Sequence, residues 1–310
     1  MNRQWIVLAT LMVMVATPTL GQTATQAAAP IGIGNQSAAS IPDLSGIWGR
    51  LSFPGFEPPL AGPGPVTNKL RGPDGTSGQY GFVGDYTNPI LKPHAVEVVK
   101  KHGEIELAGA LALSPRNQCW PGGIPFVLTN VGMQMLQQPD KITILYADNH
   151  EVRRVRMNQP HPAHVTPSWY GDSVGHYEGD TLVIDTVGIK ADRPYAMVDF
   201  FGTPYSGALH VVERYRLLDY SAAKEAEERE RENFALPAVE QGFARDPEYK
   251  GKGLQLELTV EDEVVFTTPW SATMTYRRPL SPLGQWPEIV CAENAVGYDR
   301  GEKAAVPNRG

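Results

Sequence analysis

Apolar and polar residues alternate one by one in several short stretches of the chain. Residues 253–261 show the pattern most clearly, because leucine or valine occupies every second position and polar residues lie between. A period of two is typical of a strand with one buried and one exposed face. Together with the turn residues that separate them, such stretches predict further strands at 133–138, 141–147, 151–157, 208–218 and 270–277.

Two features indicate how these strands combine. Glu178-Gly179-Asp180 is a turn signal between two apolar stretches and predicts a hairpin. Gly46-Ile47-Trp48, on the first predicted strand, resembles the G-x-W start of lipocalin-like barrels, and this resemblance implies a cavity for one small apolar ligand. We therefore expect a mainly β fold, an antiparallel β-barrel or sandwich, with the lipocalin-like barrel favoured.

Three segments interrupt the alternation. Residues 54–90 are rich in Pro and Gly and lack periodicity, which indicates an irregular surface loop. His94–Gly103 predicts a short helix that ends at its glycine. Ser221–Gln241 begins with strong helix formers, and its charges are dense and of both signs. It predicts one charged, solvated helix inserted between two strands; a helix that binds a partner is the alternative.

The N-terminus carries the features of a signal peptide. Arg3 precedes an apolar run of 12 residues, Trp5–Ala16, which is too short to cross a bilayer core of ~30 Å. We expect cleavage after Gly21 or Ala24, and no membrane insertion afterwards. No cysteine near that point could carry a lipid anchor, so the sequence predicts a periplasmic or secreted protein.

The expected domain organisation follows from these assignments. Residues 1–21 are the signal peptide, residues 22–42 a disordered linker rich in Ala, Gln and Ser, and residues 43–295 a single β-rich domain with the helical insertion at 221–241. Residues 296–310 form a flexible C-terminal tail. The formal net charge of −7 and the absence of a basic stripe argue against nucleic acid and anionic membranes as partners.

The chain has two cysteines, Cys119 and Cys291. Export to an oxidising compartment favours a disulfide between them, and two free thiols are the alternative.

Histidines and carboxylates gather in the middle of the chain. Five of the seven histidines lie between His150 and His210. If the strands are neighbours, several of these side chains converge, and His/carboxylate pairs are the usual acids and bases of catalysis. The candidate catalytic residues are His161, His176, His210, Asp172 and Glu213. His161 and His164 could begin a metal site, but no established ligand motif surrounds them, so we predict neither a metal nor a cofactor.

Glu213 has two interpretations. In residues 208–218 it shares a face with leucine, valine and tyrosine, so its carboxylate is expected to be buried and therefore paired or protonated. It is either a general acid or base in a pocket, or half of a buried ion pair with Arg153, whose own face carries Val155 and Met157.

A broader resemblance rests on a set of motifs spread over residues 43–295. These include Asp43-Leu-Ser-Gly-Ile-Trp48, Gly171-Asp-Ser-Val-Gly-His-Tyr-Glu-Gly-Asp-Thr-Leu-Val-Ile-Asp-Thr186 and Leu209-His-Val-Val-Glu-Arg214. With them the chain resembles a large group of exported, β-rich bacterial proteins. The resemblance implies export and a compact β domain and supplies no reaction. The segment 221–241 departs from the group as an insertion.

Three functions remain open at this point. The first is binding of a small apolar or aromatic molecule in a His/carboxylate-lined cavity, and the candidate ligand-binding residues are Trp48, Arg153, Trp169, Tyr215 and Trp270. The second is a cofactor-free lyase, isomerase, cyclase or hydratase that uses His and Glu/Asp on the same barrel. The third is a scaffold without a pocket. A small molecule is the expected partner in the first two.

Overall fold

The computed structural model describes residues 41–50, 55–69, 82–129, 132–234, 248–278, 291, 296–297 and 302–303. The predicted signal peptide and almost all of the predicted linker lie outside the described residues, as does most of the predicted C-terminal tail. All described residues belong to one compact unit, 37–310.

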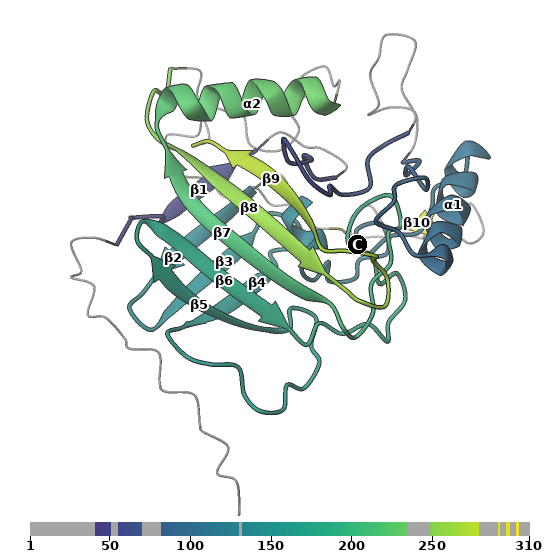
Figure 1. Cartoon of the computed structure of the whole chain (residues 1–310), viewed down its shortest axis with the longest axis horizontal. Helices are drawn as coiled ribbons and strands as arrows, with labels where there is room; N and C mark the ends of the chain where they lie inside the picture. The colour runs from purple at the N-terminus through teal and green to yellow at the C-terminus, as the bar shows by residue number, and fades with distance from the viewer. Residues whose placement is uncertain are drawn as a thin grey trace, which may run out of the picture. The chain divides into compact units, whose positions relative to one another are not determined.

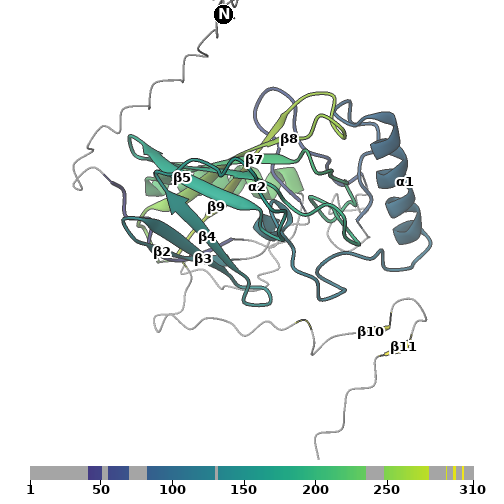
Figure 2. The ribbon, with the colours of Figure 1, turned by 90° about the horizontal axis from the view of Figure 1, so that it is seen from below.

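Nine strands form one sheet in which each strand pairs with the next along the chain (Figures 1 and 2). The strands are β1 (Gly46–Gly49), β2 (Gly132–Gln137), β3 (Lys141–Tyr146), β4 (Val152–Met157), β5 (Asp172–Glu178), β6 (Thr181–Val187), β7 (His210–Leu218), β8 (Gly253–Glu261) and β9 (Trp270–Tyr276). A separate two-residue pair joins β10 (Val296–Gly297) to β11 (Glu302–Lys303). The expected hairpin at Glu178-Gly179-Asp180 joins β5 to β6.

The sheet curls until its two edges almost meet, so the prediction of a mainly β barrel with one inserted helix is confirmed. Gly49, at the end of β1, exchanges two backbone hydrogen bonds with Arg277, just after β9, at 2.8 and 2.7 Å. One pairing differs from the expected antiparallel pattern. β4 and β5 run parallel and pair only at Arg156–Met157 with Val174–Gly175, because the chain crosses over between them through residues 158–171.

Alternate residues of the strands fill the barrel. The apolar positions of β8 are at most 1% exposed, and Glu257, between them, faces solvent. Long apolar side chains from β2, β3, β6 and β9 join them in one continuous core. The period-two pattern of the sequence thus corresponds to the inside and the outside of the barrel.

Helix α2 (Tyr220–Phe234) corrects the expectation of a fully solvated insertion. It packs against β7, β8 and β9 (Figure 1). Ala223, Ala226 and Glu230 are at most 3% exposed, and Glu230 pairs with the buried Arg50. Asp219 caps the start of the helix, because its carboxylate accepts a hydrogen bond from the backbone N–H of Ala222. Residues 235–247, where the insertion was expected to end, lie outside the described residues.

Helix α1 (Pro93–Leu107) runs past the glycine that was expected to end it. Gly103 is buried, and a Cβ atom there would lie 3.0 Å from Val83 Cγ1. The glycine therefore permits close packing against the segment that precedes the helix. The described parts of the expected irregular loop, 55–69 and 82–90, contain no helix or strand, only isolated bridges.

Cys119 and Cys291 lie at disulfide distance, with their Cα atoms 5.4 Å apart. The expected pairing is therefore present. Cys291 also donates a backbone hydrogen bond to Asn149 Oδ1, at 2.8 Å, so this point near the C-terminus is attached to the turn between β3 and β4.

Candidate functional site

A row of alternating acidic and basic side chains crosses the outer face of the barrel. Four strands contribute to it: Asp172 begins β5, Asp185 lies on β6, His210 begins β7 and Glu261 ends β8. The strand register brings the last three together, because Asp185 is opposite Val212 and His210 is opposite Glu261. All four project outward, since the residues beside them in their strands, such as Ile184 and Val211, point into the core.

His161 comes from the crossover 158–171 and completes the row. Its Nδ1 lies 2.6 Å from Asp172 Oδ2, and its Nε2 lies 3.0 Å from Asp185 Oδ1. His210 approaches the same Asp185 oxygen with its own Nε2, at 3.1 Å, and its Nδ1 lies 3.5 Å from Glu261 Oε2. Each histidine ring is thus placed between two carboxylates, and Asp185 is common to both.

Arg156 positions the crossover that carries His161. Its guanidinium donates to both oxygens of Asp172, at 2.9 and 2.7 Å, and to Gln159 Oε1, at 2.9 Å. Asn158, which starts the crossover in a left-handed conformation (φ 56°), donates its backbone N–H to Gly175 O at 2.7 Å. The loop is therefore attached to both β4 and β5 before it reaches the histidine.

The electrostatics of the row follow from these contacts. The hydrogen bond with Asp185, helped by its negative charge and by Glu261, raises the pKa of His210 despite partial burial. The same hydrogen bond lowers the pKa of Asp185, and the bond to His161 adds to the effect. The side chains of His210 and Asp185 are 32% and 36% exposed, so the row is open to solvent.

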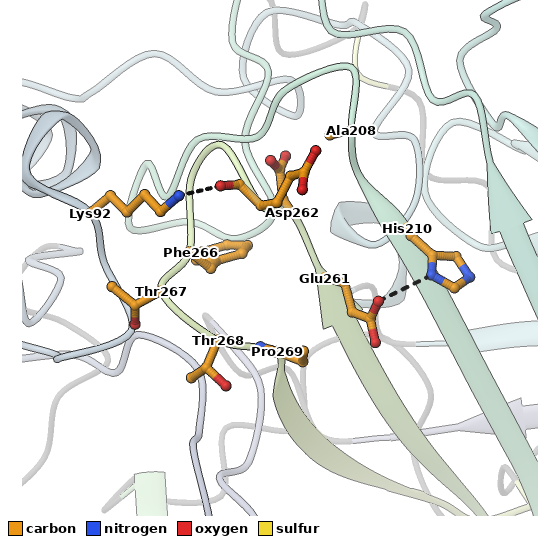
Figure 3. A pocket seen from close by; sticks show the side chains of 10 residues that line it. Lys92, Ala208, His210, Glu261, Asp262, Phe266, Thr267, Thr268 and Pro269 are labelled. Carbon is orange, nitrogen blue, oxygen red and sulfur yellow. Dashed lines mark hydrogen bonds and ion pairs between the residues drawn. The ribbon is translucent and has the colours of Figure 1, made fainter.

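A groove of about 370 Å³ adjoins the His210 end of the row (Figure 3). His210 and Glu261 form one side, and the β8–β9 connection supplies Phe266, Thr268 and Pro269. Lys92 lies on the opposite side, where its ammonium group donates to the backbone oxygen of Glu263 (Figure 3). The groove therefore combines an aromatic ring with an acidic rim.

The structure brings together three of the five candidate catalytic residues. His161, Asp172 and His210 belong to the row, and β7, which carries His210, lies beside β6. His176 lies on the same outer face of β5 as Asp172 but pairs with Glu178, at 3.1 Å, near the hairpin turn. It is therefore not part of the row.

Glu213 lies inside the barrel, and its predicted burial is confirmed. Its carboxylate forms a two-pronged ion pair with Arg153, at 2.7 and 3.0 Å, and both residues are at most 1% exposed. Tyr215 donates to Glu213 at 2.7 Å. Although burial disfavours its charge, the neighbouring carboxylate raises the pKa of Arg153. Of the two interpretations, the contacts are those of the buried ion pair.

The candidate ligand-binding aromatics are divided between the core and a loop. Trp48, Tyr215 and Trp270 are at most 1% exposed and pack within the barrel core. Trp169 is half-buried in the crossover, where the Arg193 guanidinium lies 4.8 Å from its ring centre. None of these residues, nor Arg153, lines the groove beside His210.

Two residues of the row were not selected from the sequence, Asp185 and Glu261. The alternation within 181–187 and 253–261 places both on outward-facing positions, which was the available signal. What the sequence does not contain is the strand register that places His210 opposite Glu261.

Glu151 is a further titratable residue that the sequence did not single out as a site. It accepts the backbone N–H of Gly122, at 3.1 and 3.2 Å, and the hydroxyl of Tyr170. Burial raises the pKa of Glu151 to about 7. Its contacts attach the loop after Cys119 to the start of β4, which is a structural role.

Comparison of the chain with protein-family models, with curated proteins and with solved structures finds no match. Within the part of the chain that the structure describes, neither helix has the length and apolar character needed to cross a bilayer.

Proposed function

We propose that this protein is an exported β-barrel protein that binds a small molecule in the groove beside His210 and Glu261. The observation that carries the proposal is the position of His210, which lines a groove of about 370 Å³ while two carboxylates hold its ring. This volume is within the ~300–1,000 Å³ typical of small-molecule sites.

The lining of the groove supports a particular kind of ligand. Pro269 and the small exposed part of Phe266, which is 3% exposed, offer apolar surface to an apolar or aromatic body, the kind of ligand that the sequence predicts. The Glu261 side chain is 49% exposed and supplies a carboxylate at the rim. We therefore propose a ligand that joins a compact apolar or aromatic part to a basic or hydroxyl group.

A cofactor-free acid–base enzyme, such as a lyase, isomerase, cyclase or hydratase, is the second candidate. The fixed orientation of His210 favours it, since an imidazole held by carboxylates and open to a groove is the usual form of a general acid. In that case the protonated His210 would donate a proton to the bound substrate and become a neutral imidazole, and Asp185 would stabilise the protonated ring before the transfer.

The binding proposal is tested by native mass spectrometry of protein purified from its own cells. We expect a small molecule to copurify with the wild type and to be lost from Glu261→Gln. Glu257→Gln is the matched control, because Glu257 lies on the same outer face of β8, is 47% exposed and is outside the groove. A wild type that carries nothing, or a Glu261→Gln variant that keeps the molecule, would contradict binding at this groove.

The same preparation separates binding from catalysis. If the protein is an enzyme, incubation with the identified molecule should yield a product of different mass or retention time, and His210→Gln should not form it. If it is a binding protein, the molecule should be recovered unchanged from both.

Export is part of the proposal and has its own measurement. The intact mass of the protein from periplasm or medium should correspond to a new N-terminus between Gly21 and Ala28. A full-length species in the inner membrane would contradict it.

A further inference from the structure

We propose that a cleft at the turn between β3 and β4 binds the ammonium group of a small primary amine. Two carboxylate residues, Asp148 and Glu151, are among those that line it. The cleft shares no lining residue with the groove beside His210. This site therefore goes beyond the proposed function and does not depend on it.

The turn itself places the two carboxylates near each other. Glu151 donates its backbone N–H to Asp148 O, at 3.4 Å, so these two residues close a four-residue turn. The central residues, Asn149 and His150, have φ angles of 54° and 51°. Positive φ at both central positions is what a type I′ turn requires, and the residues that close such a turn lie opposite each other. The backbone thus brings both side chains to one cleft.

Asp148 is buried without the hydrogen bonds that a carboxylate requires. It is 4% exposed, and neither of its carboxylate oxygens accepts a hydrogen bond from the residues that the structure describes. Arg116 Nε lies 3.2 Å from Oδ2 and supplies an opposite charge, but the Arg116 side chain is 41% exposed. A buried carboxylate without donors is costly. A donor that enters the cleft therefore forms a charge-assisted bond with a group that lacks one.

The size of the cleft limits what can enter. Its volume is about 10 Å³, which is room for one water-sized group. A primary ammonium group has about this size and carries three N–H donors. A quaternary ammonium ion, whose nitrogen is enclosed by four carbon substituents, exceeds this space.

The remaining walls suit a cation with a short apolar part. Phe126 and Val127, from the 3₁₀ helix η2 (Phe126–Thr129), are at most 2% exposed and exclude water. Trp120 is half-buried and supplies an aromatic ring, and aromatic rings attract cations electrostatically. The apolar part of the amine can therefore rest on Trp120 while its ammonium group reaches Asp148.

Glu151 lets the cleft accept a positive charge. Burial, with a contribution from the charge of Asp148, raises the pKa of Glu151 to about 7 although Gly122 donates to it. The other titratable or charged groups that act on the two carboxylates are Arg116, Tyr146, Tyr170 and Arg193. When an ammonium group enters, the Glu151 O–H bond breaks and its proton goes to solvent. The net charge of the cleft is then unchanged.

The test uses the full mature chain and two probes, the n-propylammonium and tetramethylammonium ions, with binding followed by ligand-observed NMR above pH 7. We expect the wild type to bind n-propylammonium and not tetramethylammonium. Asp148→Asn keeps the shape of the side chain and removes its charge, so it should weaken n-propylammonium binding ~10–100-fold. Equal binding of the two probes by the wild type, or binding of neither, would overturn the proposal.

Glu261→Gln is the matched control, because it removes one carboxylate charge from the groove beside His210 and leaves the cleft intact. It should bind n-propylammonium as tightly as the wild type does. The control also separates the two sites. If Glu261→Gln loses the amine and Asp148→Asn keeps it, the amine binds in the groove, which overturns this proposal and leaves the proposed function standing.

The pH dependence of the wild type is a second measurement that requires no variant. A primary alkylammonium ion keeps its proton near neutral pH, as the lysine side chain does. Because the Glu151 proton must leave, affinity for n-propylammonium should fall about tenfold per pH unit below pH 7 and level off above it. Glu151→Gln should remove this dependence. An affinity of the wild type that stays constant through this range would contradict the exchange at Glu151 and overturn the site as proposed.

Discussion

Arg153 and Glu213 are two charged residues that the barrel encloses completely. Besides their ion pair, Arg153 donates to Ser173 Oγ at 3.0 Å and to Thr186 Oγ1 at 2.6 Å. The guanidinium therefore has polar partners on β5, β6 and β7. Such a network is costly to break at one point, because the remaining charge cannot be hydrated.

At this residue scale we predict that Glu213→Gln destabilises the protein by ~3–5 kcal/mol, since it leaves a buried guanidinium without its counter-charge. Urea unfolding of the variant measures the loss. Glu257→Gln is the control: its pair with Arg216 is exposed, so its removal should cost ~1 kcal/mol or less. Unchanged stability of Glu213→Gln would mean that Arg153 does not require this carboxylate.

Asp199 gives a prediction for the pH dependence of stability. It is fully buried, and its Oδ1 accepts the N–H groups of Phe201 and Thr203. Burial raises its pKa from 3.8 to about 7. The folded state therefore holds this proton more tightly than the unfolded state. The stabilisation from this proton is fully present below pH 3.8, the ordinary pKa that the group has in the unfolded chain. Above that pH the free energy of unfolding falls by ~1.4 kcal/mol per pH unit, until the stabilisation is lost as pH rises through about 7.

Asp199→Asn removes the titration and keeps the carbonyl acceptor. Urea unfolding at pH 5, 6 and 7 gives the slope of the unfolding free energy against pH. We expect this slope to be less negative for the variant than for the wild type, by the amount that corresponds to about one proton. Asp180→Asn, in the exposed hairpin turn, is the control and should keep the slope of the wild type. Identical slopes for all three proteins would show that Asp199 does not hold a proton in this range.

The residues of the candidate site were only partly predictable. Alternation within 208–218 correctly placed Glu213 on the buried face, and the partner Arg153 followed from the same reasoning. The convergence of His161 with His210 could not be derived, because it depends on where the crossover 158–171 returns to the sheet. The aromatic candidates were selected by type, and residue type does not distinguish a core position from a cavity wall.

At the scale of elements, β8 has the bounds that its alternation indicated, β3 and β4 differ from theirs by one residue at one end, and β2 differs by one residue at each end. The helices were less accurate, for a physical reason in each case. In α1, Gly103 permits close packing and does not end the helix. In α2, most side chains are charged and exposed, and only Ala223, Ala226 and Glu230 form a narrow buried stripe among the residues whose burial is described. A stripe of two alanines and one glutamate has too little apolar character to appear in a hydrophobic pattern.

We predict that α2 is required for full stability, contrary to the expectation of a solvated insertion. Glu230→Ala removes the carboxylate that contacts the buried Arg50 and should cost ~3 kcal/mol or more. Glu228→Ala, two residues earlier, removes a partner of Lys224 at 3.6 Å with both side chains largely exposed, and should cost ~0.5 kcal/mol or less. Thermal unfolding of both variants gives the comparison, and equal melting temperatures would show that α2 contributes little.

At the scale of the whole molecule, short connections explain why β2 pairs with β3, β3 with β4, β5 with β6 and β8 with β9, and the sequence indicates these connections well. The parallel seam between β4 and β5 does not follow in this way. Both strands have the same alternation as their neighbours. A period-two pattern does not indicate whether a strand runs parallel or antiparallel to the strand beside it. The seam determines the site, because the crossover that makes the strands parallel also carries His161 to the outer face.

The disulfide connects positions 172 residues apart, so its largest effect is expected in the unfolded chain. In the folded state the loop after Cys119 has other attachments: Arg193 donates to Pro121 O and Gly122 O, at 2.7 and 2.8 Å, and Glu151 accepts from Gly122. We therefore predict that Cys119→Ala/Cys291→Ala keeps the native near-ultraviolet signal of Trp120 and Trp169 while losing ~2–5 kcal/mol in urea unfolding. A variant that loses the tryptophan signal at low urea would show instead that the disulfide holds this loop in place.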